Sequence, residues 1–130
     1  MAKLPIRVNS FVYKKENGGL DTLCIKRVPD DGGFWQTVTG TVEDSESFIQ
    51  TIKREIFEEC GITEEQIRKI EGPLYDFKWN KKEVEIREFV YAVEVDTNSK
   101  ITLSPEEHDN YRWCNNDDLL KVLGTENNIE

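Results

Sequence analysis

One segment, residues 40–62 (GTVEDSESFIQTIKREIFEECGI), constrains the fold of this 130-residue chain more than any other. Ser45 and Ser47 can each cap the N-terminus of a helix, and Gly61 suits the left-handed position that ends one. Apolar side chains recur at helical spacing and predict one buried face: Phe48, Ile49, Ile52, Ile56 and Cys60. The segment therefore predicts an amphipathic helix packed on a core.

The same helix carries carboxylates that local rules disfavour. At about 100° per residue, Glu55 and Glu59 lie one turn apart at the edge of the apolar face, with Glu58 beside them. Like charges at this spacing cost roughly 0.2–0.5 kcal/mol each, and the helix dipole disfavours anions in the last turn. A cation that prefers oxygen ligands, such as Mg²⁺, removes both penalties. A solvated acidic face is the alternative.

The spacing of this segment resembles the signature of the Nudix hydrolases. Every defined position of that signature is matched by Gly40, Glu46, Arg54-Glu55-Ile56, Glu58-Glu59 and Gly61-Ile62. The resemblance implies a loop–helix–loop that holds Mg²⁺ or Mn²⁺ and hydrolyses a diphosphate linkage in a nucleoside diphosphate joined to another group. It also implies the Nudix fold, an α/β/α sandwich with a mixed β-sheet.

Length and charge narrow the class of protein further. A chain of 130 residues predicts a single domain over residues 1–130. The formal net charge of −9 disfavours polymeric nucleic acid as a partner, whereas a metal ion can reverse the local sign for a small polyphosphate. The three cysteines form no zinc pattern and predict reduced thiols. Without a membrane-length apolar run or a secretory signal, we expect a cytoplasmic monomer or homodimer.

Strand patterns precede and follow the acidic helix. They occur at residues 5–13, 20–28, 34–42, 73–79, 84–95 and 111–114, with a short strand near residues 101–103. Gly40 is expected at a bend within residues 34–42. Residues 63–70 predict a helical turn capped by Thr63, and Asn116 or Asp117 can cap a closing helix. This order favours a mixed sheet covered on both faces, in agreement with the α/β fold of the resemblance.

The resemblance assigns roles within the acidic helix. Glu55 and Glu59 are expected to bind the metal, Glu58 to act as a further ligand or proton acceptor, and the Gly40 carbonyl to complete the shell. Arg54 belongs to the catalytic machinery as the residue that orients the cluster, together with Glu46. Glu43 has no role that the sequence separates from solvation.

A second polar cluster occupies residues 106–113 (EEHDNYRW). It is either a polar loop entering a strand, with His108 at the surface, or a second part of the site. From Glu107 to Trp113 it is close to the form E-H-x-x-Y-x-W, which resembles the dihydroneopterin triphosphate pyrophosphatases and the diadenosine tetraphosphate hydrolases. The resemblance predicts Glu107 as metal ligand or general base. Three other glutamates are alternatives for that role: Glu83, Glu85 and Glu88.

Substrate-binding residues are predicted around the segment FWQTVTG at residues 34–40, which resembles the same pterin enzymes. Trp35 can stack on a planar ring, although an aromatic residue in a strand is commonly part of the core. Thr39, or else Gln36, can contact a polar edge. Four cations can meet the outer phosphates: Lys3, Arg7, Lys26 and Arg27. The family alignment favours Lys3 and Arg27.

These observations predict a Mg²⁺- or Mn²⁺-dependent pyrophosphohydrolase. Its substrate is a nucleoside triphosphate or dihydroneopterin triphosphate, which it splits into a monophosphate and pyrophosphate. A diadenosine polyphosphate hydrolase is the alternative within the enzyme class. A non-catalytic nucleotide-binding module is the alternative of another class. Such modules usually lack some of the signature glutamates, whereas this sequence has all of them. The partner is thus a small nucleotide or pterin triphosphate, with no membrane involved.

Overall fold

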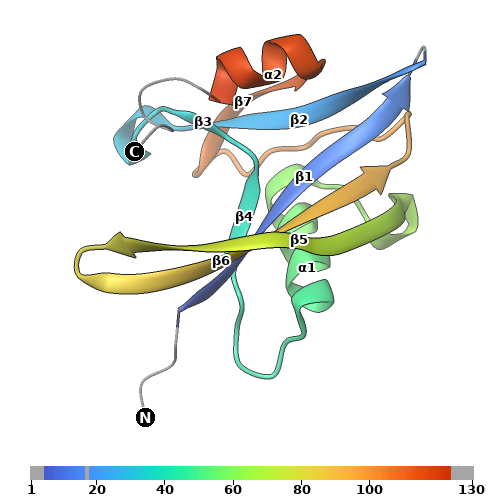
Figure 1. Ribbon diagram of the computed structural model, residues 1–130. Helices are drawn as coiled ribbons and strands as arrows, with labels where there is room; N and C mark the ends of the chain where they lie inside the picture. The colour runs from blue at the N-terminus through green and yellow to red at the C-terminus, as the bar shows by residue number, and fades with distance from the viewer. Residues whose placement is uncertain (1–4, 17, 124–130) are drawn as a thin grey trace.

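The computed structural model describes residues 5–16 and 18–123. Within these residues the chain forms seven strands and two helices, arranged as in Figure 1. The strands are β1 (Ile6–Glu16), β2 (Gly19–Arg27), β3 (Trp35–Gln36), β4 (Val38–Thr41), β5 (Ile67–Lys81), β6 (Val84–Val95) and β7 (His108–Cys114). The helices are α1 (Phe48–Cys60) and α2 (Asn116–Leu123), and short 3-10 turns occupy Pro29–Asp31 and Glu64–Gln66.

All seven strands join one mixed sheet. Its order is β3-β2-β1-β6-β5, with β4 also paired to β1 and β7 to β2. Strands β1 and β6 run parallel, with Val8 opposite Phe89 and Val12 opposite Val93. The other pairs are antiparallel. One long parallel contact at the centre thus joins two antiparallel parts.

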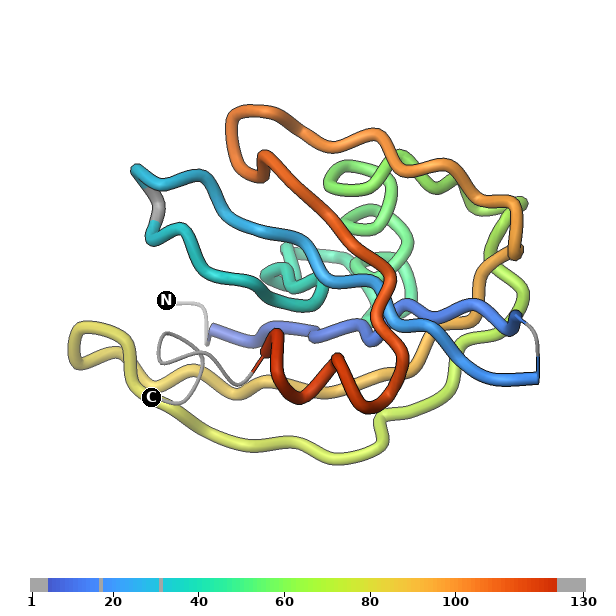
Figure 2. Tube along the Cα trace, turned by 90° about the horizontal axis from the view of Figure 1, so that it is seen from above, coloured from blue at the N-terminus to red at the C-terminus, as the bar shows by residue number. Residues whose placement is uncertain are grey.

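The two helices cover opposite faces of this sheet, as Figures 1 and 2 show. Side chains of a strand alternate between faces, so Leu23 and Ile25 of β2 join the core that contains the buried side of α1. Cys24, between them, packs with Cys114 and Val122 beneath α2. The predicted α/β/α sandwich with a mixed sheet is therefore confirmed.

Helix α1 begins and ends where the sequence predicts. The Ser47 hydroxyl accepts a hydrogen bond from the Gln50 amide at 3.1 Å, and the Gln50 side chain accepts one from the Ser47 amide at 2.7 Å. Gly61 adopts the left-handed conformation at φ 73°. Ser45, the other candidate cap, lies in the preceding loop instead.

The buried face of α1 differs from the prediction at one position. Ile52, Ile56 and Cys60 are fully buried, but Ile49 is 39% exposed. Thr51 is buried in the adjoining sector, where its hydroxyl donates to Glu46 at 2.7 Å. Ile49 shares its side of the helix with the buried Ile56 and Cys60, so the core covers this side less completely in the first turn than in the later turns.

Three predicted elements between the helix and the C-terminus need correction. Only Glu64–Gln66 forms the helical turn after Thr63, because β5 already pairs with β6 from Ile67 onward. No strand forms at residues 101–103, where the Thr102 amide instead donates to the Cys60 carbonyl at 2.8 Å. Strand β7 begins at His108 rather than at Tyr111.

Two further local corrections concern a bend and a cap. Gly40 lies inside β4, opposite Val8 of β1, rather than at a bend. Helix α2 is capped by Asn115, whose side-chain oxygen accepts from the Asp118 amide at 2.8 Å. The three cysteines are free and buried, as predicted for reduced thiols. Within residues 5–16 and 18–123, neither helix is long and apolar enough to cross a membrane.

Candidate active site

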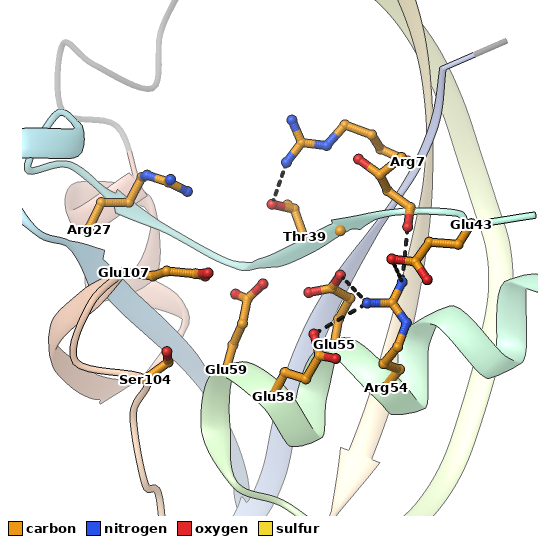
Figure 3. A pocket seen from close by; sticks show the side chains of 12 residues that line it. Arg7, Arg27, Thr39, Glu43, Arg54, Glu55, Glu58, Glu59, Ser104 and Glu107 are labelled. Carbon is orange, nitrogen blue, oxygen red and sulfur yellow. Dashed lines mark hydrogen bonds and ion pairs between the residues drawn. The ribbon is translucent and has the colours of Figure 1, made fainter. Parts of the chain in front are cut away.

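A polar pocket of about 370 Å³ opens between α1, β4 and the loop that precedes β7 (Figure 3). Carboxylates and guanidinium groups dominate its wall. The lining residues are Arg7, Arg27, Thr39, Gly40, Thr41, Glu43, Arg54, Glu55, Glu58, Glu59, Ser104 and Glu107. The pocket thus brings together the acidic helix and the second polar cluster, which are distant in the sequence.

The glycine of the signature is required by the carboxylate beside it. A Cβ atom built on Gly40 would lie only 2.1 Å from the Cδ atom of Glu55. No side chain fits there, so only glycine lets the Glu55 carboxylate lie directly against β4. Strand β4 and helix α1 are held close together at the point where the carboxylates gather.

Arg54 connects the acidic residues of the helix to the loop before it. Its Nε donates to Glu46 at 2.6 Å, and its Nη1 donates to Glu55 at 2.9 Å and to Glu58 at 3.3 Å. Its Nη2 also donates to the Thr41 carbonyl at 3.1 Å. One guanidinium therefore fixes the directions of several carboxylates at once.

Glu46 is the most strongly held of these partners. Its carboxylate accepts from Arg54, from the Thr51 hydroxyl at 2.7 Å and from the Glu43 amide at 3.0 Å. These hydrogen bonds, led by that of Arg54, lower the pKa of Glu46 to about 2. Glu46 is thus a permanent anion that anchors Arg54.

Glu59 has the opposite environment. It is 7% exposed, and its Oε1 atom has no hydrogen-bond partner among the described residues. Burial raises the pKa of Glu59 far above its usual value, and contact with Glu55 and the charge of Glu107 raise it further. A buried carboxyl group with such an unpaired oxygen is the arrangement that a bound metal ion compensates.

The donor set fits a hard divalent cation. Glu55, Glu58, Glu59 and Glu107 offer carboxylate oxygens, and the Gly40 backbone adds a carbonyl, which are the ligands that Mg²⁺ and Mn²⁺ prefer. In the described part of the chain, no three acidic, histidine or cysteine side chains already form a complete ligand set. Glu55 and Glu58 pair with Arg54, with which a bound cation would compete for their oxygens.

Glu107 reaches the pocket from the opposite side. Its amide donates to the Ser104 carbonyl at 3.0 Å, and its carbonyl accepts from the Val28 amide at 3.0 Å, so its backbone is fixed. Figure 3 shows the Glu59 and Glu107 side chains approaching the same space. The structure therefore brings Glu107 to the acidic helix.

The alternatives to Glu107 lie elsewhere. Glu83 and Glu85 belong to the β5–β6 hairpin and its turn, away from the pocket wall. Glu88 is buried and accepts hydrogen bonds from Trp79 at 3.0 Å and Asn9 at 2.9 Å. These contacts hold the Glu88 carboxyl group beside Asn9 and Trp79, and Glu88 does not line the pocket.

The predicted substrate-binding residues are divided. Arg27 and Thr39 line the pocket. Trp35 does not line it and packs half-buried against the cluster beneath α2, which is the core arrangement for an aromatic residue in a strand. Lys3 lies outside the described residues.

Arg7 is a pocket residue that the sequence ranked too low. Its Nη2 donates to the Thr39 hydroxyl at 2.8 Å, and its guanidinium lies 5.8 Å from the centre of the Trp79 ring. Its Nε is buried and without a partner among the described residues. Alternation along β1 puts Arg7 on the face opposite Val8, but only the pairing of β1 with β4 brings it beside Thr39.

Comparison with known proteins gives the class of this protein. A model of the NUDIX domain matches residues 3–129, and the chain belongs to this family. Solved structures of similar fold include proteins of the same family.

Three known proteins show what the chain is similar to. An octanoyltransferase of Myxococcus xanthus is 30% identical over 128 residues, covering 92% of this chain but only 33% of that protein. The dihydroneopterin triphosphate diphosphatase of Haemophilus influenzae is 28% identical over 130 residues, covering 92% of this chain and 79% of the relative. An Ap4A hydrolase of C. elegans, solved as a binary complex, superposes with a TM-score of 0.81 at 23% identity, covering 95% of this chain and 89% of that one. The last likeness shows the shared fold.

Proposed function

We propose that this chain is a Mg²⁺- or Mn²⁺-dependent pyrophosphohydrolase that converts a nucleoside triphosphate or dihydroneopterin triphosphate to a monophosphate and pyrophosphate. The carrying observation is the pocket itself, in which Glu55, Glu58, Glu59 and Glu107 face guanidinium groups across a small space. Carboxylates that hold cations and arginines that hold phosphates are the two halves that phosphoryl transfer needs.

The roles follow from position in the pocket. Glu55 and Glu59, with Glu58 and the Gly40 carbonyl, hold the cation, and Arg54 positions Glu55 and Glu58. When bound, such a cation lowers the pKa of a coordinated water and neutralises phosphoryl oxygens. Glu107, the most separate of the carboxylates, accepts the proton of the attacking water or completes the ligand set.

The opposite wall binds the substrate. Arg7 and Arg27 contact the outer phosphates, and Thr39, which Arg7 already holds, contacts a polar group of the substrate. Trp35 packs against the cluster beneath α2 and does not line this pocket, so we do not assign it a stacking contact here. The net charge of −9 supports a free small molecule as the substrate rather than a nucleic-acid polymer.

The similarity to the dihydroneopterin triphosphate diphosphatase supports the triphosphate class of substrate. Hydrolysis of diadenosine polyphosphates is the second candidate, because the form E-H-x-x-Y-x-W from Glu107 to Trp113 resembles both groups of enzymes. Identification of the products separates them. A triphosphate yields one monophosphate with pyrophosphate, whereas a dinucleoside polyphosphate yields two nucleotides.

The test is a substrate screen with purified protein and Mg²⁺, in which products are separated by chromatography and kcat/KM is measured for each substrate. We expect release of pyrophosphate from at least one nucleoside or pterin triphosphate, and E59Q protein serves as the inactive control. Binding of these compounds without turnover would instead identify a non-catalytic module. If the protein neither binds nor turns over any compound of the panel, the proposed substrate class is refuted.

A further inference from the structure

Three buried polar atoms without hydrogen-bond partners meet behind the carboxylate pocket. They are Glu59 Oε1, His108 Nδ1 and His108 Nε2. His108 is 1% exposed, so water does not satisfy its ring from the surface. Buried polar side chains are nearly always hydrogen-bonded, so neighbouring atoms that are unpaired among the described residues are candidates for a bond to one another.

The distance between His108 and Glu59 indicates which hydrogen bond can form. His108 Nε2 lies 4.0 Å from Glu59 Oε1, which is too long for a hydrogen bond but within reach of a small rotation of either side chain. Both atoms are unpaired, and Glu59 is the acidic group against which the ring lies. A neutral imidazole carries one N–H donor, and a carboxylate oxygen is a suitable acceptor for it.

The backbone keeps His108 in this place. Its amide donates to the Ser104 carbonyl at 2.9 Å, and the residue pairs with Arg27 at the start of β7. The same short segment carries Glu107 to the pocket, where Figure 3 shows it beside Glu59. Two adjacent residues therefore approach Glu59, one from the pocket and one, His108, from a buried position. His108 is therefore not the surface residue that a polar loop would carry.

We propose that His108 is a positioning residue for Glu59, whose Oε1 accepts a hydrogen bond from His108 Nε2 when Glu59 binds the cation. This inference rests on the proposed function. With one oxygen held by the imidazole, the other is directed to the cation, and the carboxylate loses the freedom to turn away. Hydrogen bonds of this kind to metal ligands typically change metal affinity by about 10–100-fold.

The imidazole can be observed directly, because His108 is the only histidine of the chain. In ¹⁵N-labelled protein free of a histidine tag, long-range ¹H–¹⁵N spectra report which ring nitrogen carries the proton. We expect the proton on Nε2, with its resonance moving downfield and becoming protected from exchange when Mg²⁺ is added. A proton on Nδ1, or an Nε2–H signal that Mg²⁺ leaves unchanged, would overturn the proposal.

Affinity for Mn²⁺, titrated by electron paramagnetic resonance, tests the consequence. H108Q protein, whose amide can replace Nε2–H, should bind Mn²⁺ nearly as well as the unmodified protein, whereas H108N and H108L should bind it about tenfold more weakly. C114A is the matched control, since Cys114 is buried at the far end of β7 beneath α2. The H108Q and H108N pair keeps the test valid if H108L fails to fold.

Two outcomes separate this inference from the function beneath it. If the unmodified protein binds Mn²⁺ and H108N and H108L bind it equally well, the role of His108 is refuted and the proposed function stands. If the unmodified protein binds neither Mn²⁺ nor Mg²⁺, the metal-dependent function fails and the inference falls with it.

Discussion

The two walls of the pocket are built in different ways. The acidic wall comes mostly from one helix and the strand before it, and a single guanidinium, that of Arg54, connects its members. The opposite wall comes from separate strands, with Arg7 on β1, Arg27 on β2 and Thr39 on β4. The residues of the acidic wall lie mostly in one short stretch of sequence, so their spacing can be recognised without a structure. The residues of the opposite wall are brought together by strand pairing, which spacing along the sequence does not show.

Substitutions in the two walls should also have different effects on turnover and on substrate binding. Loss of a carboxylate on the acidic wall removes the means of holding the cation, and lowers turnover for every substrate. Loss of a cation on the opposite wall weakens binding of the phosphates and leaves the chemistry intact. Variants on each side therefore test whether the division is real.

The largest effect is expected for E59Q. The amide is uncharged and cannot hold the cation, so kcat should fall by on the order of 100–1000-fold. The fold should persist, because the amide has nearly the same size and shape as the buried carboxyl group and carries no charge. Steady-state kinetics and circular dichroism measure the two parts, and turnover like that of the unmodified protein would contradict the metal assignment.

G40A tests the contact between β4 and Glu55. The new methyl group collides with the Glu55 carboxylate, which has to move by more than 1 Å, and such a displacement can reduce kcat/KM by about 100-fold. The unfolding free energy should also fall by about 1–3 kcal/mol. G19A is the matched control, since the nearest atom to a Cβ there is 3.9 Å away and its effect should be small.

R7A addresses the opposite wall. Loss of a charge-assisted contact to phosphate costs about 1.5–3 kcal/mol, which corresponds to a KM roughly 10–100-fold higher with kcat little changed. K26A, at the neighbouring cation that does not line the pocket, should leave KM nearly unchanged. Equal effects of R7A and K26A would mean that the pocket in the structure does not bind the phosphates.

The sequence also predicts the acidic wall of the pocket better than the opposite wall. Helix α1 was predictable from caps and helical spacing, and the position of Glu107 at the pocket from the resemblance, because these are local patterns. The positions of Arg7 at the pocket and of Trp35 away from it were not predictable in this way, since strand pairing decides which side chains meet there. The missing strand at residues 101–103 has a similar cause, because Thr102 bonds to the end of α1.

The pH dependence of Mg²⁺ binding probes the acidic wall further. The folded protein raises the pKa of Glu59 above its usual 4.5, so above that pH the unfolded chain has released a proton that the folded chain keeps. Folding stability without metal therefore falls as pH rises from 4.5 toward the folded pKa. Because the cation displaces this proton, its stabilising effect should grow with pH.

Thermal unfolding with and without Mg²⁺ between about pH 6 and pH 8 measures this dependence. The rise in Tm on addition of Mg²⁺ should be larger at the higher pH, with affinity changing up to about tenfold per pH unit. In E59Q protein most of the dependence should disappear. A rise in Tm that is independent of pH would show that the cation does not bind at Glu59.

The smallest effects on stability are expected at two ion pairs formed by adjacent residues of α1. Lys53 lies 2.7 Å from Glu64, and Arg54 lies 2.6 Å from Glu46, but Glu64 is 71% exposed and Glu46 only 17%. E64Q should change the unfolding free energy by less than about 0.5 kcal/mol, as exposed pairs usually do. E46Q should lower Tm more, because it removes the charge of the carboxylate that Arg54 holds most closely.

The sign of the pH effect distinguishes the two pairs. The depressed pKa of Glu46 means that its contribution to stability is present above about pH 4.5 and is lost as pH falls toward 2. The difference in Tm between the unmodified protein and E46Q should therefore narrow over that interval in acid titrations followed by circular dichroism. A difference that stays constant down to pH 2 would mean that Glu46 acts through its shape, and that the charge of Arg54 is balanced by the remaining carboxylates of the pocket.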